Sequence, residues 1–347
     1  MPPIEIPMCD VCDVSRATAG GLSCGHRFCP DCFKRYISGS IRELDTSLRC
    51  CVCGAISDLI QEMGEGRPLV TFGRLTERKL LQPMGLARVD NGDYVIVDSD
   101  TKRVMILTGS GTLREDFAYT YGTEPGGGVS VTAQGHVAIP NRDNTYDGVG
   151  YYTPGGAFIG SAFIQSEERR PDIRGVVCDK VKDVLYLTDA NNSSIIAINN
   201  ADRGQCNRIR LERIRYEVDP IPWGITLSPE GDLYVTDVAN HCVKVYSTCG
   251  QFRRKFGSYG ERPSQYKRPT GVSLTAAGHV IVADRGNQRV QHVTNDGAFL
   301  SYVVRFRAGY DVYMAPDDVI ASPDGTISVL MTSLQHTKVG GVRVYKL

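Results

Sequence analysis

The sequence has no excess of charge of either sign, because 39 Lys and Arg residues balance 39 Asp and Glu residues. A neutral chain is a poor candidate for a general polyanion-binding protein, although it can carry a local basic face. No segment approaches the roughly 18 apolar residues of a membrane-spanning helix. Residues 1–8 also lack the apolar core of a signal peptide. We therefore expect an intracellular, cytoplasmic protein without membrane association, with the nucleus left open.

The composition is that of a folded chain rich in turns. Hydrophobic residues make up 41% of it, which is enough for a packed core and excludes global disorder. The 347 residues are sufficient for two domains or one large one. The chain has 37 Gly and 17 Pro residues, a content typical of the many tight turns of a mainly β fold.

The cysteines divide the chain into two regions, since eight of the 12 lie between Cys9 and Cys53. Short Cys-x-x-Cys spacings in a chain without signs of secretion favour zinc over disulfides. Seven cysteines and one histidine are enough for two closed tetrahedral zinc sites. Cys51 is left out, because the pair Cys50 and Cys53 repeats the two-residue spacing of the others. The eight candidate ligands are Cys9, Cys12, Cys24, His26, Cys29, Cys32, Cys50 and Cys53.

This spacing, with its Cys-Gly-His-x-Phe-Cys segment, closely resembles the C3HC4 RING finger over roughly residues 5–60. The resemblance implies a cross-braced domain with two zinc ions. Two sequential zinc-ribbon sites are the alternative. Under the RING topology, Cys9, Cys12, Cys29 and Cys32 bind the first Zn²⁺, and Cys24, His26, Cys50 and Cys53 bind the second.

RING fingers are typically E3 ubiquitin ligases that position a ubiquitin-charged E2 enzyme without a nucleophile of their own. The resemblance implies an E2-docking surface that includes Val11, Tyr36 and Cys51. Cys51 stands where the family usually has proline, and Gly54 stands where a basic residue often contacts both E2 and ubiquitin. These departures leave open a RING-like zinc scaffold without ligase activity.

From Leu69 onward the sequence repeats itself. Successive units begin at intervals of 43, 47, 49, 47 and 47 residues, and each contains alternating apolar segments and glycine turns. Units of this length with four short strands each predict a β-propeller of six blades. The six units begin at Gly85, Gly128, Gly175, Gly224, Gly271 and Asp318.

Segments such as Val282-Ala-Asp-Arg-Gly-Asn-Gln-Arg-Val290 resemble the NHL repeat, which implies an NHL propeller. Blades two and six depart from the motif at Pro140-Asn141 and Met331-Thr332. The last unit lacks a fourth strand, and we expect residues 69–73 to supply it, because a propeller must close to remove sheet edges. The predicted domains are therefore a RING with a short linker, residues 1–66, and the propeller, residues 67–347.

Two sets of polar residues in the repeats are expected to be structural. Asp98, Asp189, Asp237 and Asp284 should cap turns and pair with Arg103 or Arg289 within their blades. His136 and His279 follow glycine in corresponding turns, and we interpret them as turn residues and not metal ligands.

The propeller must carry the basic excess, because residues 1–66 have a net charge of −3 and the whole chain has a net charge of 0. A predicted partner or RNA face consists of Arg253, Arg254, Lys255, Lys267 and Arg268. The preferred hypothesis is a ligase whose RING binds E2 and whose propeller recruits a protein substrate. The alternative is a post-transcriptional regulator that binds single-stranded RNA through the propeller, with an auxiliary or inactive RING.

Overall fold

The chain divides into two compact units, Met1–Gly64 and Glu65–Leu347, in the computed structural model. The structure describes residues 68–72, 80–122, 124–141, 148–165, 169–306, 314–333 and 340–347. In the first unit it describes only two short hairpins. One pairs β1 (Gly20–Gly21) with β2 (Arg27–Phe28), and the other pairs β3 (Leu48–Arg49) with β4 (Ile56–Ser57).

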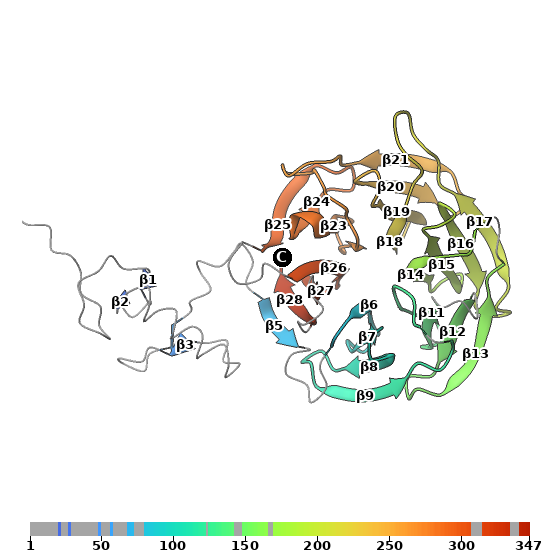
Figure 1. Ribbon diagram of the computed structural model, residues 1–347, viewed down its shortest axis with the longest axis horizontal. Helices are drawn as coiled ribbons and strands as arrows, with labels where there is room; N and C mark the ends of the chain where they lie inside the picture. Colours follow the sequence, from blue (N-terminus) through green and yellow to red (C-terminus); the bar gives the residue numbers. More distant parts are fainter. Residues whose placement is uncertain are drawn as a thin grey trace, which may run out of the picture. The chain divides into compact units, whose positions relative to one another are not determined.

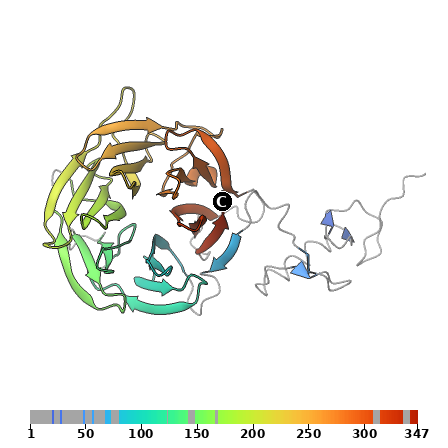
Figure 2. The same cartoon turned by 180° about the vertical axis from the view of Figure 1, so that it is seen from behind.

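The second unit is a ring of six four-stranded antiparallel sheets, which confirms the predicted six-bladed propeller (Figure 1). Each blade begins with its innermost strand and ends with its outermost strand, as the view from behind also shows (Figure 2). Blades one to three contain β6 (Pro83–Arg88), β7 (Tyr94–Asp98), β8 (Arg103–Leu107) and β9 (Leu113–Ala118); β10 (Ser130–Val131), β11 (Val137–Pro140), β12 (Gly148–Tyr152) and β13 (Phe158–Phe163); and β14 (Ile173–Asp179), β15 (Val184–Asp189), β16 (Ser194–Asn199) and β17 (Gln205–Arg210). Blades four and five contain β18 (Pro222–Leu227), β19 (Asp232–Asp237), β20 (Cys242–Ser247) and β21 (Phe252–Phe256); and β22 (Val272–Leu274), β23 (Val280–Asp284), β24 (Arg289–Val293) and β25 (Phe299–Arg305).

Blade six joins the two ends of the propeller. Its first three strands are β26 (Met314–Ala321), β27 (Thr326–Ser333) and β28 (Gly341–Lys346). The fourth is β5 (Pro68–Phe72), which pairs with β28 so that Val70 lies opposite Val344. The predicted closure by the N-terminal strand of the repeat region is therefore confirmed. It covers the outer edge of β28, which would otherwise expose unpaired backbone groups.

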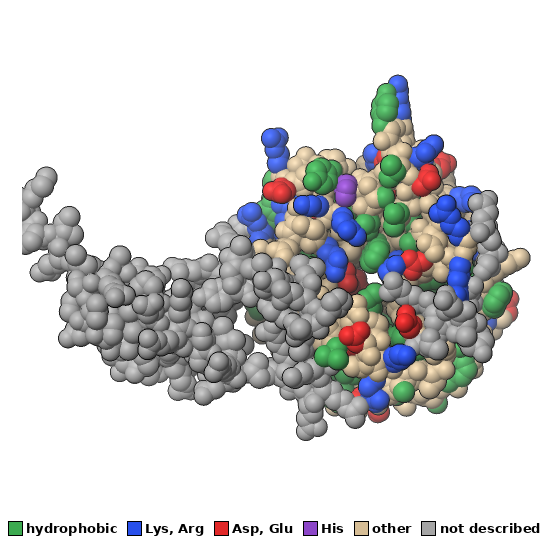
Figure 3. All heavy atoms as spheres, in the orientation of Figure 1, with side chains coloured by type: hydrophobic (Ala, Val, Ile, Leu, Met, Phe, Trp, Pro, Cys, Tyr) green, Lys and Arg blue, Asp and Glu red, His purple; other side chains and the backbone are tan. Residues whose placement is uncertain are grey.

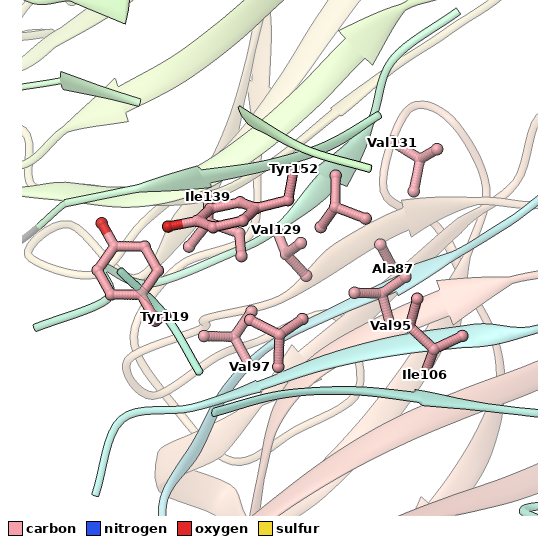
Figure 4. Close-up of a cluster of buried hydrophobic side chains, with 11 residues drawn as sticks. Ala87, Val95, Val97, Ile106, Tyr119, Val129, Val131, Ile139 and Tyr152 are labelled. Atoms are coloured by element: carbon pink, nitrogen blue, oxygen red, sulfur yellow. The ribbon is translucent and has the colours of Figure 1, made fainter. Parts of the chain in front are cut away.

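The core lies between neighbouring blades. Alternate residues of β7 and β8, such as Val95, Val97 and Ile106, pack against Ile139 and Tyr152 of the next blade (Figure 4). All five side chains are almost fully buried. Strands buried on both faces explain why the central strands are nearly continuous apolar segments.

Glycine begins five of the six units because the innermost strands crowd together at the axis. A Cβ atom at Gly85 would lie 2.6 Å from the carbonyl carbon of Gly128. One at Gly175 would lie 2.4 Å from the carbonyl oxygen of Trp223. Side chains do not tolerate such contacts, so glycine here permits close approach of backbones. Among the described residues, no helix is long and apolar enough to cross a lipid bilayer.

Candidate partner-binding face of the propeller

One face of the ring is held together by a repeated aspartate. Asp189, Asp237 and Asp284 end the second strand of blades three, four and five. Each carboxylate accepts a hydrogen bond from a backbone N–H of the segment that enters the same blade. The donors are Asp172 N at 3.1 Å, Ile221 N at 3.1 Å and Lys267 N at 2.7 Å. The loops within blades are thereby tied to the loops between blades.

An asparagine three residues later completes the connection. The side-chain amides of Asn192, Asn240 and Asn287 donate to these aspartates at 2.7–2.8 Å. Each amide also donates to a backbone carbonyl of the entering segment, at 2.8–3.1 Å. The prediction that the repeated Asp residues cap turns is therefore confirmed, and this face is a firmly held platform for the side chains of its loops.

The cation that neutralises the aspartate comes from the third strand in blades four and five and from the fourth strand in blade three. Arg289 pairs with Asp284 in blade five as predicted, with Nε 2.7 Å from Oδ2. Asp189 pairs with Arg208 of β17, and Asp237 pairs with Lys244 of β20. In blade one the prediction was wrong: Arg103 forms its ion pair with Asp116 of β9. The carboxylate of Asp98 instead accepts from Leu81 N, Gln82 N and Thr101 N.

Lys244 is fully buried and anchors a long loop on this face, residues 211–221 between β17 and β18. Its Nζ lies 2.7 Å from Glu217 Oε2 and 3.1 Å from Asp237 Oδ2, and it donates to the Glu212 carbonyl oxygen at 3.1 Å. Burial alone would lower the pKa of Lys244, but its hydrogen bond with Glu217 and the charge of Asp237 raise that pKa above its usual value.

The pKa of Glu217 is also shifted by its neighbours. Burial would raise its pKa, but hydrogen bonds from Lys244 and Lys255 bring the pKa below its usual value. The loop therefore returns to the blade through a charged, hydrogen-bonded anchor. Its tip presents Tyr216, which is 91% exposed and stacks with the Arg215 guanidinium at 4.9 Å.

A second aromatic group lies on the loop between blades four and five. Tyr259 is 63% exposed and contacts the ring of His241, with centroids 5.0 Å apart. Burial lowers the pKa of His241, which keeps its Nδ1 available to accept the Arg268 N–H at 3.0 Å. Lys267 is half-buried and Arg268 is exposed beside this pair. Figure 3 shows Lys and Arg side chains over this half of the ring, interleaved with hydrophobic and acidic side chains.

The five predicted basic residues fall into two groups. Lys267 and Arg268 lie in the loop between β21 and β22, on the face described above. Arg253, Arg254 and Lys255 lie on β21, the outermost strand of blade four. The β21 residues have local partners: Arg253 pairs with Asp232, Arg254 donates to Tyr234 Oη at 2.6 Å, and Lys255 pairs with Glu217.

The axis of the ring contains a polar channel of about 240 Å³. Arg174 stacks on Trp223 at 4.4 Å on its wall, and Asp317 faces Arg285, with Oδ1 and Nε 3.2 Å apart. Asp318 occupies the place that glycine holds in the other five blades. Burial raises the pKa of Asp318 to about 7, and the neighbouring carboxylate of Asp317 contributes in the same direction.

His136 and His279 lie directly after tight turns, at the start of β11 and β23. The described residues contain no group of three or more His, Cys, Asp and Glu side chains placed to hold a metal ion. The predicted zinc ligands and E2-docking residues lie outside the described residues. They are Cys9, Cys12, Cys24, His26, Cys29, Cys32, Cys50, Cys53, Val11, Tyr36 and Cys51. The segments that follow Asn141 in blade two and Ser333 in blade six also lie outside them.

Comparison with known proteins identifies the repeat. The family model described as "NHL repeat" matches residues 221–246 and 266–293, which span most of blades four and five. Residues 221–293 contain NHL repeats. The Asp–Asn network continues into blade three, outside the matched residues, so the NHL geometry extends beyond them.

The similarity to curated relatives lies over the NHL region. The chain is 38% identical over 63 residues to E3 ubiquitin-protein ligase TRIM32 of Homo sapiens, which is 18% of this chain and 10% of that protein. It is 27% identical over 111 residues to Protein brain tumor of Drosophila melanogaster, which is 31% of this chain and 10% of that protein. The chain thus matches about a tenth of the length of these relatives.

Solved structures share the fold of the NHL propeller. A streptogramin B lyase superposes with a TM-score of 0.56 at 14% identity, covering 78% of this chain and 85% of that chain. A selenomethionine-substituted virginiamycin B lyase from Staphylococcus aureus gives 0.54 at 14% identity, covering 82% of this chain and 89% of that chain. At this identity the likeness concerns the fold alone.

Proposed function

We propose that the chain is a RING-type E3 ubiquitin ligase whose NHL propeller recruits the protein substrate. The observation that carries the proposal is the spacing of seven cysteines and one histidine between Cys9 and Cys53. Thiolate and imidazole donors in this number fit two Zn²⁺ ions with four protein ligands each. Closed sites of this kind supply folding energy, and they leave no open position for a catalytic water.

Catalysis in this proposal is positioning. Val11, Tyr36 and Cys51 contact the E2, and the restrained E2–ubiquitin thioester is then attacked by a substrate lysine. The propeller brings that lysine within reach by holding the substrate on the loops fixed by the Asp–Asn network. The similarity of the NHL region to that of an E3 ligase supports this division of labour.

An autoubiquitination assay of the full chain with a panel of E2 enzymes tests the proposal. We expect ubiquitin transfer with at least one E2 and its loss in Val11→Arg, which places a charge in the docking surface without removing a zinc ligand. Arg268→Ala, on the propeller, is the matched control and should retain autoubiquitination. Absence of transfer with every E2, in a chain that native mass spectrometry shows to hold two zinc ions, would refute ligase activity and leave the zinc scaffold.

A second candidate function is binding of single-stranded RNA by the propeller. It is favoured by exposed Tyr216 and Tyr259 beside Arg215, Lys267 and Arg268, since aromatic rings stack on bases while cations contact phosphates. The similarity of the NHL region to Protein brain tumor concerns this same part of the chain.

Fluorescence anisotropy with a labelled single-stranded RNA tests this candidate. Binding should weaken with salt by a slope of about −0.7 per phosphate contact. Tyr259→Ala should weaken it at all salt concentrations, and Arg268→Ala should weaken it and also reduce the slope. Arg253→Ala is the matched control, because Arg253 lies on the outer strand. Equal effects of Arg253→Ala and Arg268→Ala would show that binding does not use the loop face.

A further inference from the structure

Blade five contains a pair of histidines whose ring nitrogens touch. His279 Nδ1 and His292 Nε2 are 3.1 Å apart, and the ring centroids are 5.1 Å apart with 47° between the planes. His279 lies at the start of β23, and His292 lies on the neighbouring strand β24. Both side chains are half-buried, so the pair is accessible from solvent.

The backbone fixes both residues. The His279 N–H donates to Thr275 Oγ1 at 3.1 Å, which closes the turn, and His292 is held in the ladder opposite Ile281 and Ser301. The second ring nitrogen of His292, Nδ1, lies 3.3 Å from Ser301 Oγ. When that nitrogen carries the proton and donates to the hydroxyl, Nε2 of His292 is unprotonated and can act as a metal donor.

Some other blades carry a different residue at the position of His279. In blades one and four it holds Asp93 and Asp232, which pair with arginines of the fourth strand, with the atoms 2.9 and 3.6 Å apart. In blade five an imidazole, that of His279, takes the place of the carboxylate, and its neighbour His292 lies on the third strand, not at the fourth-strand position of those arginines. The site therefore holds two ring nitrogens where blades one and four hold an ion pair.

The separation of the two nitrogens fits chelation. A metal ion at about 2.05 Å from each nitrogen would subtend an angle of about 98° at a separation of 3.1 Å. This value lies between the square-planar and tetrahedral angles. Chelation also needs no net proton release from a neutral pair, because His279 can move its proton from Nδ1 to Nε2. Burial, and the neighbouring His279, lower the pKa of His292, which favours the neutral donor.

We propose that His279 and His292 form a bidentate site for a late divalent transition-metal ion. Imidazole pairs suit Ni²⁺, Cu²⁺ and Zn²⁺, and affinity in this row rises toward Cu²⁺. Two protein ligands leave the remaining coordination positions to water or to a donor from a bound partner. The pair includes none of the zinc ligands predicted in residues 9–53.

The test is a titration of the zinc-loaded, dialysed full chain with Ni²⁺, followed by the ¹H–¹⁵N spectrum of the histidine rings. Paramagnetic broadening reports each ring separately, so metal bound by the cysteines does not interfere. The matched control is His136 of blade two, which follows an identical Gly-His turn with its N–H 3.1 Å from Thr132 Oγ1. Tyr151 lies there opposite Ala138, the place that His292 takes opposite Ile281.

We expect the His279 and His292 signals to broaden together at Ni²⁺ concentrations that leave His136 sharp. His292→Gln should weaken broadening at His279 at least about tenfold, because the second donor acts at high effective concentration. His279→Gln, which alters only a turn position, should have the reciprocal effect on His292. Equal broadening of His136 and His279, or no response at a large excess of Ni²⁺, would overturn the proposal.

Discussion

Replacing Lys244 with methionine tests whether the buried ion cluster of blade four determines the stability of the propeller. The ammonium group is fully buried between Glu217 and Asp237, which are themselves 7% and 1% exposed. Methionine keeps the length and most of the volume of lysine but removes the charge. Two buried carboxylates would then face each other, with only the partly exposed Lys255 to neutralise Glu217.

The expected cost follows from the burial. Removing one partner of a buried ion pair costs about 3–5 kcal/mol, because the remaining charge loses its compensation. Removing the charge of Lys255, whose side chain is 36% exposed, should cost only about 0–1 kcal/mol. Lys255→Met is therefore the matched control, since it contacts the same Glu217 from the solvent side.

Urea unfolding can be followed through Trp223, the only tryptophan of the chain, which lies on β18 of the same blade. With an m-value of about 3 kcal/mol per molar urea, we expect the midpoint to fall by about 1–1.7 M in Lys244→Met. In Lys255→Met it should fall by less than about 0.3 M.

The pH dependence gives a second check. The pKa of Glu217 is lowered in the folded state, so its contribution to stability is complete above the pKa of an unfolded glutamate. It is lost as the pH falls through the folded-state pKa. The difference between the wild type and Lys244→Met should therefore shrink in acid. A midpoint shift at neutral pH no larger than that of Lys255→Met would refute the reasoning.

Two further predictions concern the axis of the ring. Burial raises the folded-state pKa of Asp318 from 3.8 to about 7, so its contribution to stability is complete below the pKa of an unfolded aspartate and is lost as the pH rises from there through the folded-state value. Asp318→Asn should match the wild type below about pH 4 and exceed its urea midpoint at pH 8. Equal curves at both pH values would contradict this. Gly271→Ala places a Cβ atom 2.6 Å from the Cα of Asp318 and should cost about 1–3 kcal/mol. In the control Gly155→Ala the nearest atom is 3.9 Å away, so its melting temperature should equal that of the wild type. Similar melting temperatures for the two variants would show that the axis is not crowded.

The repeat period was sufficient to predict the blades, because each unit carries its own strands, turns and apolar alternation. The closure by β5 followed from counting strands in the last unit. The reason for the glycines at the axis could not be predicted in this way, since Gly85 and Gly128 meet across two blades and neither sequence segment alone shows the contact.

Side-chain pairs within a blade were harder to predict than the strands of the blade. Arg103 lies opposite Asp98 in the ladder, yet its side chain pairs with Asp116 on the other neighbouring strand. The histidine pair was missed for the same reason. The turn that contains His279 was recognised, but the pairing of β23 with β24 that places His292 beside it cannot be read from the turn segment alone.

The Asp–Asn network shows why the loop face, rather than the outer strands, is the candidate for recognition. The requirement at each aspartate is a nearby cation, and Arg208, Lys244 and Arg289 meet it from three different strand positions. Because the cation is not tied to one position, the loop sequences can vary while their backbones remain fixed. Tyr216 and Tyr259 are thus exposed on loops whose backbones are anchored by buried charges, so a partner can bind them without first ordering those loops.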